Sequence, residues 1–173
     1  SSGKTTLIKA LQQAFEEPFL HLGMDKIIGF MPDKLNNWKG GKAPVGFSWT
    51  PEKDPTGKTS YHMNKEPFAK KLLQTLKDVT LLFAFQKYHL IIEDVAFGLP
   101  EVNEWKKTLR NQRTFYIGTN APLQVLENRE KARGNRYLGT SRSQYFRVHK
   151  DVQYDLELDT HVNSLEKNVE IIK

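Results

Sequence analysis

The chain opens with SSGKTTLIKALQQAF at residues 1–15, and this stretch decides the expected fold. Its apolar residues recur at spacings of three and four, at Leu7, Ile8, Leu11 and Phe15. That period predicts an amphipathic helix that begins close to Lys4. The triplet Gly3-Lys4-Thr5 at a helix start matches the second half of a phosphate-binding loop, GxxxxGK[ST]. We expect the first glycine and the strand of this loop to lie upstream of Ser1.

Such a loop binds phosphate through its backbone N–H groups and the helix dipole, its lysine reaches the outer phosphates, and its hydroxyl ligates Mg²⁺. A second GKT at residues 57–59 lies among glycines and prolines. Because neither a strand nor a helix flanks it, we interpret it as coincidence.

Short apolar runs and helical periods alternate along the rest of the chain. Strands are predicted at 18–22, 89–95, 114–118 and 154–158, and helices at 26–31, 68–85, 100–109, 123–133, 136–148 and 164–172. Residues 33–67 are rich in glycine and proline and are predicted to be an irregular loop, in which a hairpin is an open alternative. The alternation favours an α/β domain with a parallel sheet.

Composition excludes several function classes. The 173 residues contain no cysteine, which excludes disulfides, thiolate zinc sites and cysteine nucleophiles. No apolar run is long enough to span a membrane and no signal peptide is visible, so a cytoplasmic protein is expected. The net charge of +6 comes from scattered basic residues, which argues against nucleic acid as a partner.

Two acids end the predicted strand 89–95. Glu93-Asp94 follow the apolar run, and an acid at that end of a parallel strand lies at the ligand-binding edge of the sheet. We predict that Asp94 ligates Mg²⁺ together with Thr5. The alternative is an acid that caps the next segment.

Three arginines lie near the end of the predicted helix 123–133. Arg129 and Arg133 are four residues apart and share one face, and Arg136 follows the turn at Gly134. Converging guanidinium groups can stabilise the charge that develops during phosphoryl transfer. The alternative is a solvated helix whose arginines pair with neighbouring glutamates, Glu127 or Glu130.

One carboxylate follows the predicted strand 18–22. Asp25 could accept a proton from an acceptor hydroxyl, or it could be a plain N-cap of the next helix, which the residues alone favour. The histidines show no metal-ligand spacing, and we assign them no role.

Together these segments resemble the chloramphenicol phosphotransferase-like family of small phosphate-loop kinases. The matching stretches, in family order, are SSGKTTLIKALQ, EEPFLHLGMDKIIGFMP, LIIEDVAFG, ENREKARGNRYLGTSRSQ and VHKDVQYDLELDT. The resemblance implies one domain over residues 1–173, with a three-layer P-loop kinase fold and a mostly parallel central sheet. It also implies a small helical lid at 129–147 that carries arginines, and an acceptor-side insertion at 33–67.

The resemblance further implies ATP and Mg²⁺, and transfer of the γ-phosphoryl group to a hydroxyl of a small molecule. Asp25 occupies the position of the general base, and Arg133 and Arg136 those of the catalytic lid arginines. Lys4 matches the loop lysine, which has both a catalytic and a nucleotide-binding role. The nucleotide-binding positions are Ser2, Gly3, Lys4, Thr5, Thr6, Arg129 and Thr160.

Residues 33–67 depart from the family pattern because they are richer in lysine and tryptophan. That difference argues for an acceptor other than chloramphenicol. It also keeps open a nucleotide-binding regulatory or effector module that acts on a protein or nucleic acid. A weaker alternative is an ATP hydrolase in which Glu93 activates water.

Overall fold

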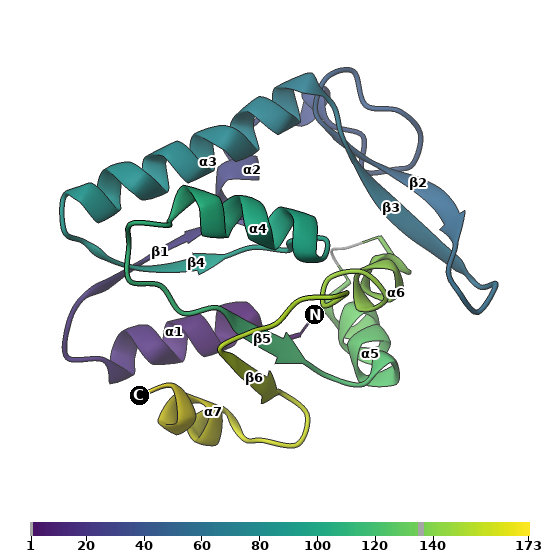
Figure 1. The fold of residues 1–173 in the computed structure, drawn as a ribbon. Coiled ribbons are helices and arrows are strands. Elements are labelled where there is room, and N and C mark those ends of the chain that lie inside the picture. Colours follow the sequence, from purple (N-terminus) through teal and green to yellow (C-terminus); the bar gives the residue numbers. More distant parts are fainter. Residues whose placement is uncertain (1, 135–136) are drawn as a thin grey trace.

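A computed structural model describes residues 2–134 and 137–173 and has the expected α/β class. The helices are α1 (Lys4–Ala14), α2 (Met24–Ile28), α3 (Pro67–Phe85), α4 (Leu99–Thr108), α5 (Leu123–Arg133), α6 (Thr140–Tyr145) and α7 (Leu165–Ile172), with a 3-10 turn at Asp33–Leu35. The strands are β1 (Phe19–Gly23), β2 (Phe47–Lys53), β3 (Thr59–Lys65), β4 (His89–Glu93), β5 (Ile117–Asn120) and β6 (Leu156–Asp159). Figure 1 shows their arrangement.

The strands form pairs where a single central sheet was predicted. β1 pairs with β4 and β5 pairs with β6, both in parallel, and β2 pairs with β3 in antiparallel. Within the described residues, neither parallel pair is hydrogen-bonded to the other. The predicted parallel pairing of strands is therefore confirmed, but in the described residues the strands do not join into one central sheet.

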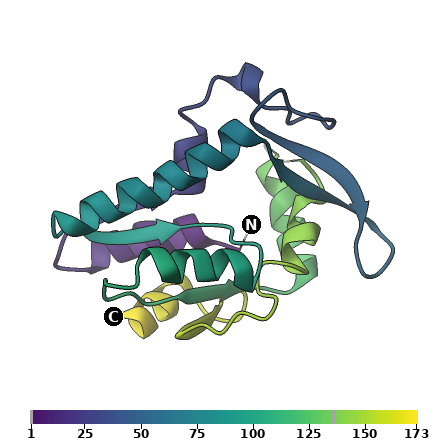
Figure 2. The same ribbon diagram turned by 45° about the horizontal axis from the view of Figure 1, so that its top comes forward.

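The parallel pair β1–β4 carries helices on both faces (Figures 1 and 2). Successive side chains of a strand point to opposite faces, and β4 shows this directly. Ile91 packs in a cluster with the α1 residues Leu7 and Leu11. Its neighbour Ile92 packs in a different cluster with Leu76 of α3 and with α4. A helix, a strand pair and a helix are thus layered at this part of the molecule.

The segment 33–67 is not the irregular loop that its composition predicts, because it contains the hairpin β2–β3. The Asp54 carboxylate accepts hydrogen bonds from the N–H groups of Thr56 and Lys58, and Gly57 takes φ +80°. A side chain that holds its own turn in this way is a usual hairpin device. The second GKT therefore lies at a hairpin turn and not at a helix start. The hairpin buries Phe47 completely in a cluster with Met24 and β3.

Several predicted boundaries move. The helix after β1 begins at Met24 with Gly23 as its N-cap residue, so the N-cap interpretation of Asp25 is wrong. The helix predicted over 136–148 is the shorter α6, which follows Gly139 at φ +96°. The strand predicted over 114–118 is β5, two to three residues later, and Phe115 before it is 70% exposed. Gly134 ends α5 in the left-handed conformation, as predicted.

No helix among residues 2–134 and 137–173 combines the length and the apolar character that crossing a membrane requires.

Candidate functional site

A cavity of about 560 Å³ lies where α1, α2, β4, α5 and the end of β6 meet. It is lined by residues from separate stretches of the chain, which are 2–7, 24–25, 93–95, 129–133 and 160–168. Among its lining residues are the predicted site residues Ser2, Gly3, Lys4, Thr5, Thr6, Asp25, Asp94, Arg129, Arg133 and Thr160. Arg136 lies outside the described residues. The fold thus brings around one cavity residues that lie more than 150 positions apart in the sequence.

The start of α1 forms the floor of this cavity. Gly3 has φ +84° and precedes the first helical residue, and its carbonyl accepts the N–H of Leu7. The Lys4 ammonium lies 3.4 Å from the Ser2 hydroxyl, which is 3.1 Å from the hydroxyl of Thr119 on β5. The unpaired N–H groups of a helix start and an adjacent ammonium form an anion-binding arrangement.

A hydrogen-bonded chain connects this loop to the end of β4. The Thr5 hydroxyl donates to the Glu93 carboxylate at 2.8 Å, and the other oxygen of that carboxylate lies 3.0 Å from His21 Nε2. Burial lowers the pKa of His21, and the charge of Lys26 lowers it further against the opposing effect of Glu93. A neutral imidazole that donates Nε2–H to Glu93 fits this arrangement.

Glu93 is the residue that sequence reasoning underrated. It lies opposite Gly23 in the β1–β4 register, and a Cβ at Gly23 would approach the Glu93 side chain and backbone to 3.2 Å. The glycine therefore provides the room in which the Glu93 side chain sits. The sequence signal that could have identified Glu93 is a glycine that ends one predicted strand and an acid that ends the strand paired with it.

Asp94 is engaged differently. Its carboxylate accepts hydrogen bonds from the indole Nε1–H of Trp105 on α4 at 2.6 Å and from the N–H of Val95 at 2.7 Å. Burial raises the pKa of Asp94 and outweighs these two hydrogen bonds, which act to lower it. Asp94 thus ties β4 to α4, and the carboxylate that contacts the loop hydroxyl is that of Glu93. The assignment of Asp94 as a metal ligand stays a prediction.

The arginine helix α5 forms another wall. Arg129 donates to the hydroxyl of Thr160 at 3.1 Å and to its carbonyl at 2.8 Å. The exposed Arg133 lines the cavity one turn later. The neighbouring glutamates have other partners, because Glu127 accepts from Arg142 and Glu130 accepts from residues 139–141. Arg129 is therefore bonded to Thr160 and is not part of the helix-surface pairing considered for it.

Asp25 lies in the first turn of α2, exposed, in the wall that also contains Met24. Its carboxylate is thus on the solvent-accessible side of the cavity, where a hydroxyl-bearing molecule could reach it. By contrast, Asp159 accepts the N–H groups of His161 and Val162 and holds the turn that follows β6. That turn sets the position of Thr160 opposite Arg129.

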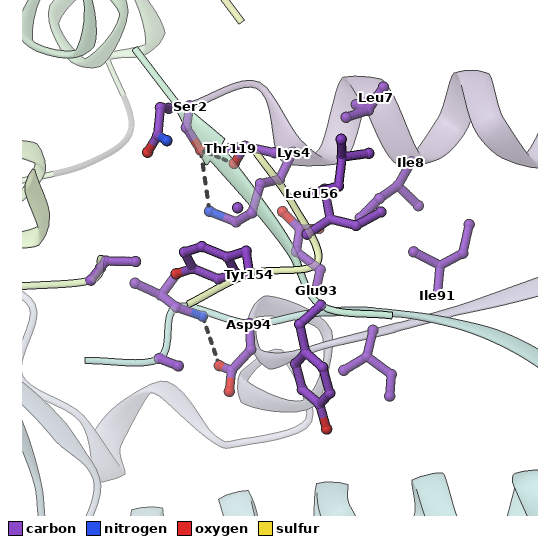
Figure 3. Close-up of a pocket in the computed structure, with 18 of the residues that line it drawn as sticks. Ser2, Lys4, Leu7, Ile8, Ile91, Glu93, Asp94, Thr119, Tyr154 and Leu156 are labelled. Carbon is purple, nitrogen blue, oxygen red and sulfur yellow. Dashed lines mark hydrogen bonds between the residues drawn. The ribbon is translucent and has the colours of Figure 1, made fainter. Parts of the chain in front are cut away.

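A second and larger cavity, of about 1550 Å³, adjoins the first (Figure 3). Residues of β4 and of β5 line it, together with apolar side chains of α1 such as Leu7 and Ile8. In the part of the chain that the structure describes, each of these two strands has a hydrogen-bonded partner strand on one edge only. The larger cavity therefore lies between two strand edges and is mostly apolar, and it shares the charged residues Lys4, Glu93 and Asp94 with the smaller one.

Within the described residues, no cluster of three or more histidine, cysteine, aspartate or glutamate side chains could enclose a metal ion. A cation at Thr5 and Glu93 would therefore take further oxygen ligands from a phosphate or from water. Mg²⁺ is usually bound in this way, through one or two protein oxygens and the substrate phosphates.

Comparison with known proteins relates the whole chain to a family of phosphotransferase-like proteins. A family model described as chloramphenicol phosphotransferase-like protein matches residues 1–173. Two curated proteins of Mycobacterium tuberculosis, from strains CDC 1551 / Oshkosh and ATCC 25618 / H37Rv, are each 23% identical to the chain over 161 residues. The match covers 92% of this chain and 71% of each relative. Both relatives are named "Putative O-phosphotransferase".

Proposed function

Because this chain belongs to the chloramphenicol phosphotransferase-like family, we propose that it is an ATP-dependent phosphotransferase that acts on a small-molecule hydroxyl. The observation that carries the proposal is the 560 Å³ cavity. It brings together the start of α1, the Asp25 carboxylate and two arginines of α5, which lie far apart in the sequence. Phosphoryl transfer requires these same elements, because its catalysis is positioning plus charge stabilisation.

On the nucleotide side, Gly3, Lys4 and Thr5 hold the phosphates, with Ser2 and Thr6 beside them. The backbone N–H groups at the start of α1 bind phosphate oxygens, and the Lys4 ammonium neutralises the outer phosphates. Arg129 of α5 donates to Thr160, which follows β6, and both are assigned to the nucleoside side of the same molecule.

Hard oxygen donors at Thr5 and Glu93 fit Mg²⁺, and Asp94 is the further candidate that the sequence indicated. When bound, Mg²⁺ supplies positive charge against the phosphate oxygens. The Thr5 hydroxyl donates its hydrogen to Glu93 and keeps its oxygen lone pairs, which it would offer to the cation.

Asp25 is assigned as the general base. The acceptor oxygen attacks the γ-phosphorus, the bond from that phosphorus to the β–γ bridging oxygen breaks, and the acceptor proton passes to the Asp25 carboxylate. Arg133, together with Arg136 outside the described residues, places guanidinium charge against the equatorial oxygens of the transferred group. The products are ADP, a phosphate monoester and a proton.

The test is an acceptor screen with γ-labelled ATP over chloramphenicol, aminoglycosides, nucleosides and sugars. We expect transfer to one class, no transfer by Lys4→Ala, and slower turnover by Asp25→Asn with ATP affinity nearly unchanged. Lys9→Ala, an exposed position on the same helix α1, is the matched control and keeps the parent rate. An Asp25→Asn enzyme that turns over at the parent rate removes Asp25 as the base.

Two other outcomes decide against an acceptor-specific kinase. Tight RNA or DNA binding with a steep salt dependence would favour the regulatory or effector module. ATP hydrolysis that proceeds equally fast with and without every acceptor would favour a hydrolase.

We also propose that an additional strand, leading directly into Ser2, fills the 1550 Å³ cavity and joins the two parallel pairs into one sheet. Two features support it. The open edges of β4 and β5 line the same apolar space, and a phosphate-binding loop connects a strand to its helix. Such a strand, buried on both faces, would be a short run of β-branched and other apolar residues in parallel with both neighbours.

This strand is tested by placing five β-branched residues and a glycine-containing turn before Ser1. We expect the midpoint of thermal unfolding to rise and the amides of β4 and β5 to exchange more slowly. An extension of equal length with serine in place of the β-branched residues is the control. Equal effects of both extensions would refute the strand.

A further inference from the structure

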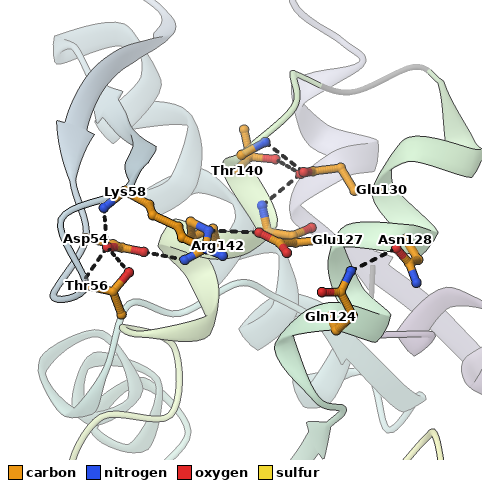
Figure 4. Close-up of polar contacts among 11 residues, drawn as sticks. Asp54, Thr56, Lys58, Gln124, Glu127, Asn128, Glu130, Thr140 and Arg142 are labelled. Carbon is orange, nitrogen blue, oxygen red and sulfur yellow. Dashed lines mark hydrogen bonds and ion pairs between the residues drawn. The ribbon is translucent and has the colours of Figure 1, made fainter.

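The hairpin β2–β3 is tied to α6 by buried and half-buried charges. The Arg142 side chain is 9% exposed and donates through Nη1 to Asp54 at the hairpin turn, at 2.6 Å, where the aspartate side chain is 1% exposed. Further along, Glu52 of β2 accepts from the Ser143 hydroxyl at 3.0 Å and forms an ion pair with Arg147. The hairpin therefore contacts α6 at two places, at Arg142 through Asp54 and at Ser143 through Glu52. Figure 4 shows the Asp54 contact.

Arg142 has a second partner on the arginine helix. Its Nε donates to Glu127 of α5 at 2.8 Å, so one guanidinium joins the hairpin turn to α5 through two carboxylates. A planar guanidinium can do this because its N–H groups point in fixed, divergent directions, which an ammonium cannot reproduce. Burial by itself raises the pKa of Asp54, but hydrogen bonds led by that from Arg142 lower it to about 2. The aspartate is thus ionised at neutral pH.

The Arg142–Glu127 contact lies on a different face of α5 from the face that lines the 560 Å³ cavity. At 100° per residue, Arg129 and Arg133 lie within about 40° of each other, and Glu127 lies roughly 120° or more from both. Glu130 lies between these faces, roughly 60° from both Glu127 and Arg133, and accepts hydrogen bonds from residues 139–141. One side of α5 is therefore anchored to α6 and the hairpin, and another presents arginines to the cavity.

We propose that Arg142 is a positioning residue that couples the acceptor-side hairpin to the arginines of α5. This inference rests on the phosphotransferase activity proposed above. In it, the hairpin, α6 and α5 move as one body, and the Asp54–Arg142–Glu127 contact fixes where Arg129 and Arg133 stand relative to the phosphates. Arg142 itself touches neither substrate.

The expected kinetic signature follows from what the arginines stabilise. Charge on the equatorial oxygens is spread most in the transition state, so misplaced guanidinium groups lower kcat more than they weaken ATP binding. A shift of about 1 Å in a positioning element can lower the rate on the order of 100-fold. If Arg142 only supported the fold, its substitution would lower the unfolding temperature, and kcat measured far below that temperature would be unchanged.

The experiment compares Arg142→Met, Asp54→Asn and Glu127→Gln with the parent, at least 15 °C below the lowest unfolding midpoint. We expect each to lower kcat about 10- to 100-fold with the KM for ATP within about twofold. The double variant Asp54→Asn/Arg142→Met should have a kcat no lower than that of Arg142→Met alone, because both substitutions break the same Asp54–Arg142 contact. Arg142→Lys should not restore the rate. Lys58→Ala, an exposed side chain at the same hairpin turn, should keep the parent kcat.

Unchanged kcat in these variants, with an active parent, overturns the coupling and leaves the phosphotransferase assignment standing. If the parent transfers no phosphate, that assignment fails instead, and hydrogen exchange still tests the coupling. Asp54→Asn, which changes a residue of the hairpin and none of α5, should then speed amide exchange in α5, and Lys58→Ala should not. Faster exchange confined to the hairpin and α6 would overturn the proposal.

Discussion

Glu130 gives the sharpest stability prediction. It lies on α5, is 2% exposed, and accepts hydrogen bonds from the N–H of Gly139 at 2.7 Å, the hydroxyl of Thr140 at 2.5 Å and the N–H of Ser141 at 2.8 Å. The helix α6 begins at Thr140, and its N-cap residue is a glycine without a capping side chain. Glu130 thus supplies from another helix the carboxylate that a local N-cap would provide.

The cost of Glu130→Ala follows from these contacts. Hydrogen bonds to a charged group contribute about 1.5 kcal/mol or more each, so three amount to about 4.5 kcal/mol. Relief from burying the carboxylate offsets part of this, which leaves a net loss of about 3 kcal/mol. In a protein of this size each kcal/mol lowers the unfolding midpoint by about 2–4 °C, so we expect a drop of about 6–12 °C.

Thermal unfolding followed by circular dichroism and urea unfolding measure both quantities. Glu130→Gln keeps one acceptor oxygen and loses the charge, so its stability should fall between the parent and Glu130→Ala. Lys131→Ala, exposed and next along the same helix, is the control and should change the midpoint by about 1–2 °C. A Glu130→Ala midpoint no lower than that of the control would refute the view that this carboxylate caps α6.

Three further predictions concern the core, the hairpin and the metal site. Leu158→Ala on β6, where the side chain is 1% exposed, should lower the free energy of unfolding by about 2–5 kcal/mol in urea titrations, and a loss under 1 kcal/mol would contradict its place in the core. Because the pKa of Asp54 falls from 3.8 to about 2 on folding, its contribution to stability is complete above pH about 4 and is lost as the pH falls toward 2. The stability difference between the parent and Asp54→Asn should therefore shrink over that interval in urea titrations at stepped pH, and a constant difference would refute the linkage. Glu93→Gln should raise the Mg²⁺ concentration for half-maximal transfer about tenfold, measured by metal titration at saturating ATP, with an unchanged value arguing that Glu93 lies apart from the cation.

Local signals made part of this protein predictable from its sequence. The period-four apolar pattern after Gly3 specified α1, and Gly134 specified the end of α5, because one face of a helix and one left-handed residue are encoded within a few positions. Lys4, Thr5 and the acids at the end of β4 were singled out by local motif chemistry, whereas the roles of Asp25 and Thr160 were implied only by the family resemblance. Their meeting in one cavity follows from parallel strands placing their ends at one edge.

Other features depend on contacts between residues far apart in the sequence, and no short segment of the sequence predicts them. Whether Glu93 or Asp94 faces Thr5 depends on the side to which each side chain points once β4 pairs with β1 beside Gly23. The hairpin β2–β3 was hidden because its strands are stabilised by pairing with each other and by burying Phe47 against Met24, while its glycines and prolines are typical of loops.

The roles of Arg142 and Glu130 were equally beyond the sequence. Arg142 meets a carboxylate 88 positions away, and Glu130 caps a helix that begins ten residues later across a turn. An ion pair or a cap made between distant segments leaves no periodic or spacing signal, because its energy arises only when both partners are removed from water together. The sequence therefore determined elements with a local signal, such as α1, and the tertiary structure determined the hairpin and which carboxylate meets which cation.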